Sequence, residues 1–473
     1  MSLRVSPAGW VDATIGDVIK PVAGIDPGTA PHALIDYIDI GSIDSERGVV
    51  AAPKSILGID APSRARQAVR EGDVLFSTVR PYLRAIASVP RLRSPVASTG
   101  FCVLRPAIGV DRRYLLHWVR STEFIDGVLP LQRGSSYPAV RDADVHAQPL
   151  PLPPTTEQQR IADRLDELLG EIDRAAVELA EAKRKVALYR QSLLKSAIEG
   201  KLTAEWRSDF TQVDAATSAA SPEGWAEIPN CWRWSTAEAE CGFITKGTTP
   251  PKSLTSDGAK CVPFLRVTNL THDGLLNFSD QVFVAEDVHR KFLARSIVKP
   301  GDVLMNIVGP PLGQVSMVPS TFPEWNVNQA IAIFRVRPGL LNEFLAYVLL
   351  SPGAGRWLQA RAKTTAGQTN LTLEVCRGLP VPVPPPAEQA KIVRILNQQL
   401  GSLTEQGQAI DRALAMASAQ RQNILRAAFS GQLVPQYPND EPASVLLERI
   451  RAQRQTAVPS TKRKPGRTAK ATA

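Results

Sequence analysis

Residues 150–169 read LPLPPTTEQQRIADRLDELL, and residues 381–400 repeat this pattern as VPVPPPAEQAKIVRILNQQL. The two copies align without a gap, so that Glu157 falls on Glu388. The period between them is far too long for a solenoid repeat. The repeat instead indicates a duplicated module, in which a globular domain is followed by a long helix.

The repeated segment has the spacing of a coiled coil. From Ile161 to Leu193, apolar residues recur at alternating steps of four and three, which is a heptad seam. Thr155 and Gln158 have the spacing of a capping box, and Gly200 is placed to end the helix. We therefore expect a helix of about 44 residues, or a rod of roughly 65 Å.

The second copy keeps this spacing but has a more polar seam, which includes Gln399, Gln406 and Gln420. Such a helix is poorly stable alone, because most helical stability comes from packing of an apolar face. Its simplest partner is the first helix. Since duplicated modules tend to be related by a twofold, we expect the two helices to pair antiparallel. The alternative is that each helix packs only on its own domain.

The regions before each helix also correspond. GDVLFSTVRPYLRAIASVP from Gly72 lies over GDVLMNIVGPPLGQVSMVP from Gly301 without a gap. Both regions contain short apolar runs broken by Gly and Pro, which predict strands with turns and one or two short helices. The expected fold class is therefore α+β, with two such domains separated by two long antiparallel coiled-coil helices and related by a pseudo-twofold internal repeat.

This pattern predicts six segments along the chain. They are a first globular domain at 1–150, a central long helix at 151–206, a linker at 207–224, a second globular domain at 225–380, a C-terminal long helix at 381–434, and a short helix with a basic, disordered tail at 435–473. The short helix is expected to carry Val445, Leu446 and Ile450 on an apolar face.

The composition argues against several classes of protein. The five cysteines are widely spread without a C-x-x-C, and no histidines have H-x-x-x-H spacing, so a disulfide framework and a metal site are not expected. No stretch is long and apolar enough for a membrane span, and no apolar signal core is present. We therefore expect a cytoplasmic protein.

The charge alone does not identify a partner. The net charge is +9, but five of the positive residues lie in the tail from Thr461 onward. A basic balance permits binding to nucleic acid without proving it. Binding to DNA is therefore to be inferred only from how the polar residues are organised.

Motifs of catalytic sites are missing from the sequence. Gly242–Thr248 has the glycine spacing of a phosphate-binding P-loop but lacks its lysine. There is no G-x-G-x-x-G, no G-x-S-x-G and no tetrapeptide of the adenine-methyltransferase type. The sequence therefore predicts a binding or assembly subunit and not an enzyme.

Polar loops in matching places of the two domains are the candidate functional sites. Arg, Lys, Asn and Gln side chains read base edges, while Ser and Thr hydroxyls hold phosphates. The alternative is that many of these residues only solvate turns. The candidates in the first domain are Thr78, Arg80, Tyr82, Arg84, Arg133, Ser135, Ser136 and Tyr137. Those in the second are Lys246, Thr248, Thr249, Lys252, Arg266, Asn269, Lys363, Thr364, Thr365 and Gln368.

The repeated motif resembles a known family. PLPxP-x-x-x-E-Q-x-x-I, followed by a heptad helix ending in S-x-L-x-x-A-x-x-G-x-L, runs from Pro149 to Leu202, and Pro380 to Leu433 repeat it with Val381 in place of the leucine and Asn423 in place of the serine. This arrangement resembles the DNA-specificity subunit of type I restriction-modification systems. The Gly-x-Thr-x-Pro loop at Gly247 is similar to a loop of that family's target-recognition domains, whereas the first domain offers only a poor match at 28–31.

The resemblance implies a function and a set of partners. Each domain would read one half of a bipartite, asymmetric site on double-stranded DNA. The helices would set the spacer and dock two methyltransferase (modification) subunits, which translocating endonuclease (restriction) subunits would join. This chain would bind no cofactor, and S-adenosylmethionine would sit on the methyltransferase partner.

Three alternatives remain open from the sequence. One is a nucleic-acid enzyme with an unrecognised site, and a second is a coiled-coil scaffold without a DNA role. The third is a specificity subunit that serves a different restriction class or acts alone.

Overall fold

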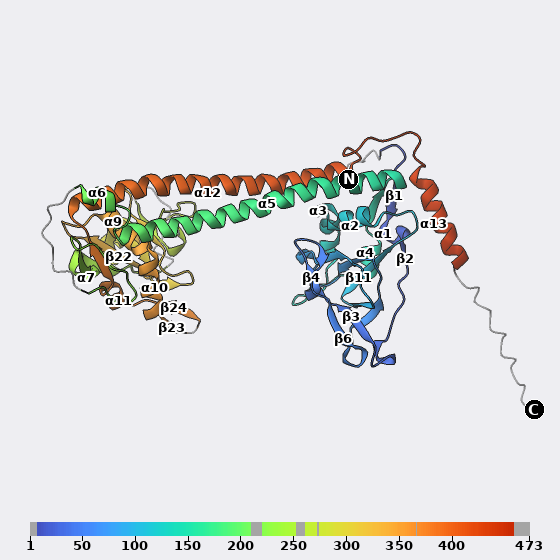
Figure 1. The fold of residues 1–473 in the computed structure, drawn as a ribbon, viewed down its shortest axis with the longest axis horizontal. Coiled ribbons are helices and arrows are strands. Elements are labelled where there is room, and N and C mark those ends of the chain that lie inside the picture. Colours follow the sequence, from blue (N-terminus) through green and yellow to red (C-terminus); the bar gives the residue numbers. More distant parts are fainter. Residues whose placement is uncertain (1–6, 210–219, 252–260, 272–273, 366, 458–473) are drawn as a thin grey trace, which may run out of the picture. The chain divides into compact units, whose positions relative to one another are not determined.

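The computed structural model describes residues 7–209, 220–251, 261–271, 274–365 and 367–457. They form two compact units, each with one globular domain and part of both long helices (Figure 1). The first unit comprises 1–178 with 413–473, and the second comprises 179–412. The globular domains are mixed helix and strand, as expected. No described helix is long and apolar enough to cross a membrane.

The first unit contains two main sheets. The larger has the strand order β2-β11-β8-β9-β5-β4, and the smaller has the order β6-β3-β10-β7. The strands of the larger sheet are β2 (Ile19–Lys20), β11 (Phe101–Pro106), β8 (Val74–Ser77), β9 (Ile86–Ser88), β5 (Val49–Val50) and β4 (Ile43–Asp44). Those of the smaller sheet are β6 (Lys54–Leu57), β3 (Leu34–Ile38), β10 (Pro95–Ser98) and β7 (Ala65–Ala68).

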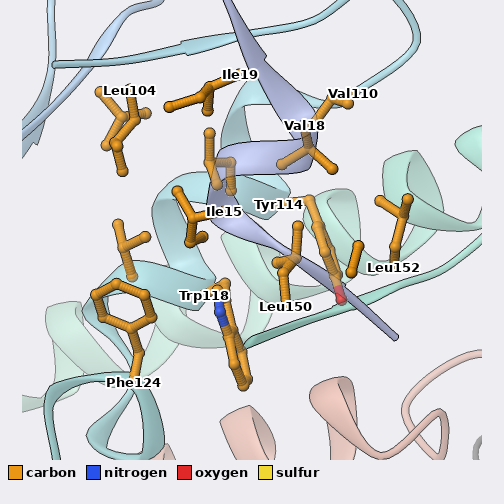
Figure 2. Packing of buried hydrophobic residues seen from close by; sticks show 14 of the residues in the cluster. Ile15, Val18, Ile19, Leu104, Val110, Tyr114, Trp118, Phe124, Leu150 and Leu152 are labelled. Atoms are coloured by element: carbon orange, nitrogen blue, oxygen red, sulfur yellow. The ribbon is translucent and has the colours of Figure 1, made fainter. Parts of the chain in front are cut away.

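The helices of the first unit cover its core. They are α1 (Ile15–Val18), α2 (Arg112–Arg120), α3 (Thr122–Val128) and α4 (Asp142–His146). Helix α2 begins where the Asp111 carboxylate accepts from the N–H groups of Arg113 and Tyr114, which is a standard N-cap. Tyr114 and Trp118, one turn apart, then point into the same cluster as Ile15 and Leu150 (Figure 2).

The proline-rich strand before the long helix explains part of the repeated motif. Strand β12 (Pro149–Leu152) pairs antiparallel with β1 (Val11–Thr14). Prolines donate no backbone hydrogen bond, but their carbonyls accept, and Trp118 Nε1 donates to Pro149 O at 2.9 Å. The Tyr114 hydroxyl likewise donates to Pro151 O. The motif therefore fixes helix α2 to the start of the long helix.

The second unit repeats this topology. Its sheets have the orders β14-β22-β18-β20 and β16-β15-β21-β17, and β13 pairs with β25 as β1 does with β12. The predicted internal repeat is therefore confirmed in three dimensions. The strands are β13 (Arg233–Thr236), β14 (Cys241–Lys246), β15 (Cys261–Leu265), β16 (Val282–Ala285), β17 (Ile297–Val298), β18 (Val303–Asn306), β20 (Val315–Met317), β21 (Trp325–Val327), β22 (Ile331–Val336) and β25 (Pro380–Val383). The helices include α7 (Ala237–Glu240), α9 (Asn342–Leu350), α10 (Pro352–Arg361) and α11 (Leu373–Arg377).

Two long helices of 44 residues each, α5 (Thr155–Ile198) and α12 (Pro386–Phe429), have the predicted length. They run antiparallel: within the first unit Asp173 pairs with Arg421, and within the second Lys183 lies 2.6 Å from Asp411. The expectation of paired helices is confirmed, and the alternative in which each helix packs only on its own domain is wrong.

The predicted seams are correct only near the globular domains. In the first unit, Ile161 and Leu165 of α5 are buried in one cluster with Ile424 of α12. On the second helix, however, Gln406 and Gln420 are exposed and do not lie in the seam. Two helices without further cover bury only a narrow stripe, so polar residues are tolerated beside it.

The Gln of the repeated Glu-Gln pair does not cap the helix, so the predicted capping box is wrong. Gln158 is fully buried, and its Oε1 accepts from Asp111 N at 2.9 Å while its Nε2 donates to Pro153 O at 2.9 Å. Gln389 repeats this role, accepting from Leu341 N. Each Gln therefore ties a long helix to the loop that starts α2 or α9.

Both long helices end at a glycine, as predicted for Gly200. Gly200 has a φ of +71°, and a Cβ added there would lie 2.4 Å from Cγ of Pro229. Gly431 has a φ of +72°, and a Cβ added there would likewise lie 2.4 Å from Cγ of Pro7. A side chain at either position would be excluded both by the backbone conformation and by the proline against it.

The chain after the first long helix stays folded slightly longer than the predicted linker boundary. Helix α6 (Ala204–Ser208) carries Arg207, which lies 2.6 Å from the buried carboxylate of Glu388. Thr203 Oγ1 and Trp232 Nε1 also donate to Glu388, at 2.6 and 2.8 Å. Arg207 therefore belongs to the second unit and not to a linker.

The predicted short C-terminal helix is α13 (Ala443–Ala457). Leu446 and Ile450 are buried in the core of the first unit, as expected, whereas Val445 is 40% exposed and faces away. Arg454 donates to the carbonyls of Gly16 and Ile19, next to α1. The predicted disordered tail lies outside the described residues.

Candidate nucleic-acid interface

Two loops of the first unit meet at one edge of the larger sheet. Strand β8 ends opposite the start of β11, and the chain continues into the one-turn helix η4 (Pro81–Leu83). Arg80 N donates to Pro138 O at 2.8 Å, and Val140 N donates to Thr78 O at 2.9 Å. The predicted residues of 78–84 and 133–137 are therefore brought together. We call residues 78–84 and 133–139 the first edge.

Most of the predicted side chains of the first edge face solvent. Arg133, Ser135, Ser136 and Tyr82 are exposed, and Tyr137 is 72% exposed. Arg80 and Arg84 are half-buried. The Arg80 guanidinium lies 5.0 Å from the centre of the Tyr137 ring, which is cation–π geometry.

Thr78 differs from these residues because it is buried. Its hydroxyl donates to Gly100 O at 2.9 Å, and its amide N donates to the same carbonyl. Its donor capacity is therefore used within the protein. In this structure Thr78 connects the first edge to the loop between β10 and β11.

The second unit places its loops at the matching edge. Strand β22 lies between β14 and β18, where Lys246 is opposite Ala332 and Asn306 is opposite Ile331. Strands β14 and β18 therefore end at the same edge of the sheet. The loop at 247–249 follows β14, and β19 (Val308–Gly309) follows β18.

The loop after β14 depends on a glycine. A Cβ at Gly247 would lie 2.1 Å from Val327 O, so no other residue fits this close approach. The hydroxyl of Thr248 accepts from Arg295 Nε at 3.2 Å, and that of Thr249 accepts from Gln329 N at 3.3 Å. The glycine thus lets the two threonines pack against the neighbouring loop, while Lys246 stays exposed.

A hairpin completes this edge. Strands β23 (Lys363–Thr365) and β24 (Gln368–Asn370) form a separate three-stranded sheet with β19, in which Val308 pairs with Asn370 and Gly309 with Thr369. Lys363, Thr364 and Gln368 are exposed. We call residues 246–249, 363–365 and 367–370 the second edge. Lys252 lies outside the described residues, and of Thr365 only the backbone is described.

Arg266 and Asn269 have mainly structural contacts. Asn269 is 1% exposed; its Oδ1 accepts from Arg266 N at 2.7 Å and its Nδ2 donates to Asn277 O at 2.8 Å. Arg266 pairs with Asp280. These contacts hold the turn after β15, so Asn269 is not exposed for base reading.

Two arginines that the sequence did not predict as site residues contact loops at corresponding places of the two units. Arg66 on β7 lies 2.7 Å from Asp26, at the start of η1 (Pro27–Thr29). Arg295, just before the corresponding strand β17, reaches Thr248. The first unit therefore has its own loop where the second has Gly247–Thr249, although the sequences barely match. Only the alignment of the two sheets reveals this correspondence.

Two features of the described residues bear on catalysis. No group of three or more His, Cys, Asp or Glu side chains among them is arranged to hold a metal ion. Cys102 Sγ lies 3.3 Å from His146 Nε2, but burial raises the pKa of the Cys102 thiol. A buried thiol with a raised pKa is a poor nucleophile. This pair therefore gives no support to a cysteine enzyme.

The chain matches proteins of known role over most of its length. The family model described as "Type I restriction modification DNA specificity domain" matches residues 64–183 and 240–410. The specificity subunit of the type I restriction enzyme EcoKI from Escherichia coli K12 is 23% identical over 96% of this chain and 97% of its own. That of EcoBI from E. coli is 30% identical over 64% of each chain.

Solved structures give the same assignment. A chain from a study of complex assembly and conformational transition in a type I R-M system has a TM-score of 0.70 at 30% identity, covering 90% of this chain and 99% of that one. The HsdS subunit from Thermoanaerobacter tengcongensis has a TM-score of 0.51 at 29% identity, covering 91% and 99%. The chain belongs to the family of type I restriction-modification DNA-specificity proteins.

Proposed function

We propose that this chain is the DNA-specificity subunit of a type I restriction-modification complex. In this role the first edge reads one half of a bipartite, asymmetric site on double-stranded DNA and the second edge reads the other half. The observation that carries the proposal is that two repeated sheets expose, at the same edge, polar loops with different side chains. A scaffold without a DNA role does not require such polar loops at both edges.

The exposed chemistry suits duplex DNA. Lys363 and Gln368 on the second edge, and Arg133 on the first, supply the cationic and amide groups that read base edges. Ser135 and Ser136 supply hydroxyls that hold phosphates. The two edges share a framework but differ in these side chains, so each is expected to prefer a different base sequence.

The catalytic steps belong to partners in this proposal. Two methyltransferase subunits, which bind S-adenosylmethionine, dock on the paired helices α5 and α12. Translocating endonuclease subunits join that complex. This chain itself catalyses no reaction and binds no cofactor, and the complex acts in the cytoplasm.

Methylation of the host genome tests this proposal. Single-molecule sequencing identifies the methylated motifs in cells with this gene and in cells without it. A third strain carries a variant in which Lys363, Thr364 and Gln368 are all changed to Ala. Deletion should abolish methylation at one bipartite motif. The variant should relax or change one half of that motif, while the chain remains folded and bound to its partners. If deletion leaves every methylated motif intact, the proposed function is wrong.

A further inference from the structure

The one-turn helix of the first edge has an unusual backbone. Among the described residues, only Arg80 and Arg84 are non-glycine residues with positive φ, at 49° and 52°. Side chains of L-residues disfavour this left-handed region. In the ungapped alignment of the two copies, the corresponding positions are Gly309 and Gly313, and Gly313 has a φ of +77°.

The first copy therefore keeps arginine where glycine would relieve strain. Strained backbone persists only where its surroundings hold it in place, and it is concentrated at functional sites. Here Arg80 N donates to Pro138 O at 2.8 Å and Arg84 N donates to Pro81 O at 3.0 Å. The Arg84 guanidinium also reaches Thr122 Oγ1 at 3.4 Å. The turn between the two arginines is thus held from both sides.

The apex of this turn is apolar and exposed. Tyr82 is 48% exposed and Leu83 is 53% exposed, and neither belongs to the hydrophobic clusters of the first unit. In the second unit the apex is Pro311 and Leu312, and Leu312 packs partly buried against the core. An exposed aromatic and aliphatic pair is therefore present only in the first of the two described turns.

The surroundings of the apex favour DNA over a protein surface. Arg80 and Arg133 lie on the same edge, and the exposed Tyr137 ring stacks on Arg80. The nearby carboxylate of Asp144 is already paired with Arg141 and lies 3.6 Å from Arg133. Cations beside an aromatic face suit phosphates and stacked bases. Proteins that unstack DNA insert apolar side chains between base steps in this way.

We propose that Tyr82 and Leu83 form a wedge that enters the base stack in the half-site read by the first edge. The matching turn of the second unit supplies no such wedge, because Leu312 is partly buried against the core. This inference rests on the proposed function, since it requires that the first edge lies on duplex DNA.

Fluorescence of 2-aminopurine tests the wedge, since this base analogue brightens when it is unstacked. Each purine of the recognised site, known from the methylome, is replaced in turn, and the complex of this chain with its methyltransferase partners is added. The wild-type complex should give a rise at one step of the first half-site. The Y82A/L83A double variant should lose this rise and bind the site roughly 5- to 150-fold more weakly, as expected for the loss of one stacked base.

Two further variants make the result specific. Y82F keeps the ring and should keep the fluorescence rise. I108A removes an exposed apolar side chain at the opposite end of β11, and it should change neither the fluorescence rise nor the affinity for the site. The wedge is overturned if the rise persists in Y82A/L83A, if the wild type binds its site without any rise, or if the double variant instead loses the methyltransferase subunits. A wild-type complex that does not distinguish its site from random DNA would overturn the proposed function, and the wedge with it.

Discussion

Single residues divide the reading of the site between the two edges. Gln368 and Lys363 are exposed on the second edge, and Arg133 and Tyr137 are exposed on the first. None of these four side chains is part of a hydrophobic core. Substitution of any of them should therefore change DNA recognition without changing the fold.

The first prediction concerns Gln368. A bidentate amide contact contributes about 1–3 kcal/mol of base discrimination. We expect Q368A to relax one position in one half of the methylated motif, and R133A to relax the other half only. Methylome sequencing of each variant measures both effects. Gln453, exposed on α13 and outside both edges and both long helices, provides the control, since Q453A should leave both halves unchanged. Equal damage to both halves by Q368A, in a folded chain, would contradict the two-reader arrangement.

The second prediction concerns Asp440, which joins the C-terminal segment to α5. Hydrogen bonds from Arg160, at 2.6 Å, and from Thr156 lower the pKa of Asp440. A carboxyl group whose pKa is lower in the folded state stabilises the fold above its unfolded pKa. This stabilisation is lost as the pH falls below about 4. We therefore expect D440N to lower the melting temperature at pH 7. The variant should also show a smaller drop in melting temperature between pH 7 and pH 3 than the wild type.

Thermal unfolding between pH 7 and pH 3 measures this effect. Glu441, the neighbouring acid, is the matched control: it pairs with Arg449, but both side chains are about half exposed. Exposed ion pairs contribute little to stability. E441Q should therefore change the melting temperature far less than D440N, and equal effects would rule out a special role for Asp440.

At the level of elements, the sequence was sufficient to predict helices and strands where a local residue pattern marks them. The heptad spacing from Ile161 onward predicted α5, its length, its end at Gly200 and the pairing with α12. A heptad spacing indicates the face on which a helix packs, so the helix and its pairing can be predicted without tertiary structure, although the seam is buried only near the globular domains. Strands and short helices were predicted as a class, because the turns between them are marked by Gly and Pro.

Contacts between elements could not be predicted in this way. Gln158 looked like a cap, but it bonds the loop before α2, which is distant in sequence. Thr78 and Asn269 looked like surface donors, but tertiary packing buries both. Arg66 and Arg295 were missed because β7 and β17 correspond only through their places in the sheets. Burial and partner choice at loops depend on the whole fold, and no local pattern reports them.

The third prediction concerns the paired helices as a spacer. The ion pairs of Asp173 with Arg421 and of Lys183 with Asp411 have one common register, so an insertion must be made in both helices to preserve it. Seven residues inserted after Ala182 and seven after Arg412 add two turns, about 10 Å, and keep the seam in phase. We expect the tolerated spacer between half-sites to lengthen by about three base pairs, at roughly 3.4 Å each.

Methylome sequencing gives this spacer length directly, while the two half-sequences should remain as in the wild type. Insertion into α5 alone serves as the control. It would shift the register of the pair and should destabilise the chain instead of producing a defined new spacer. An unchanged spacer in the double insertion, with methylation retained, would show that the helices do not set it.

At the level of the whole molecule, the internal repeat bears on stoichiometry. Each compact unit contains the start of one long helix beside the end of the other, so the same combination of segments occurs twice in one chain. The pairs formed by Gly200 with Pro229 and Gly431 with Pro7 show that this correspondence extends to the helix ends. A partner that recognises this combination therefore finds it twice.

The fourth prediction follows from this duplication. We expect two methyltransferase subunits to bind each copy of this chain, because each unit offers an equivalent helix pair. Native mass spectrometry of the co-expressed complex measures the ratio. Proline is incompatible with a helix interior, so A182P should break α5 at its middle and reduce occupancy at both positions. A control substitution at the exposed Ala180, A180S, should leave the ratio at two to one. A stable one-to-one complex at saturating methyltransferase would mean that the two helix pairs, although related by the repeat, are not equivalent as docking surfaces.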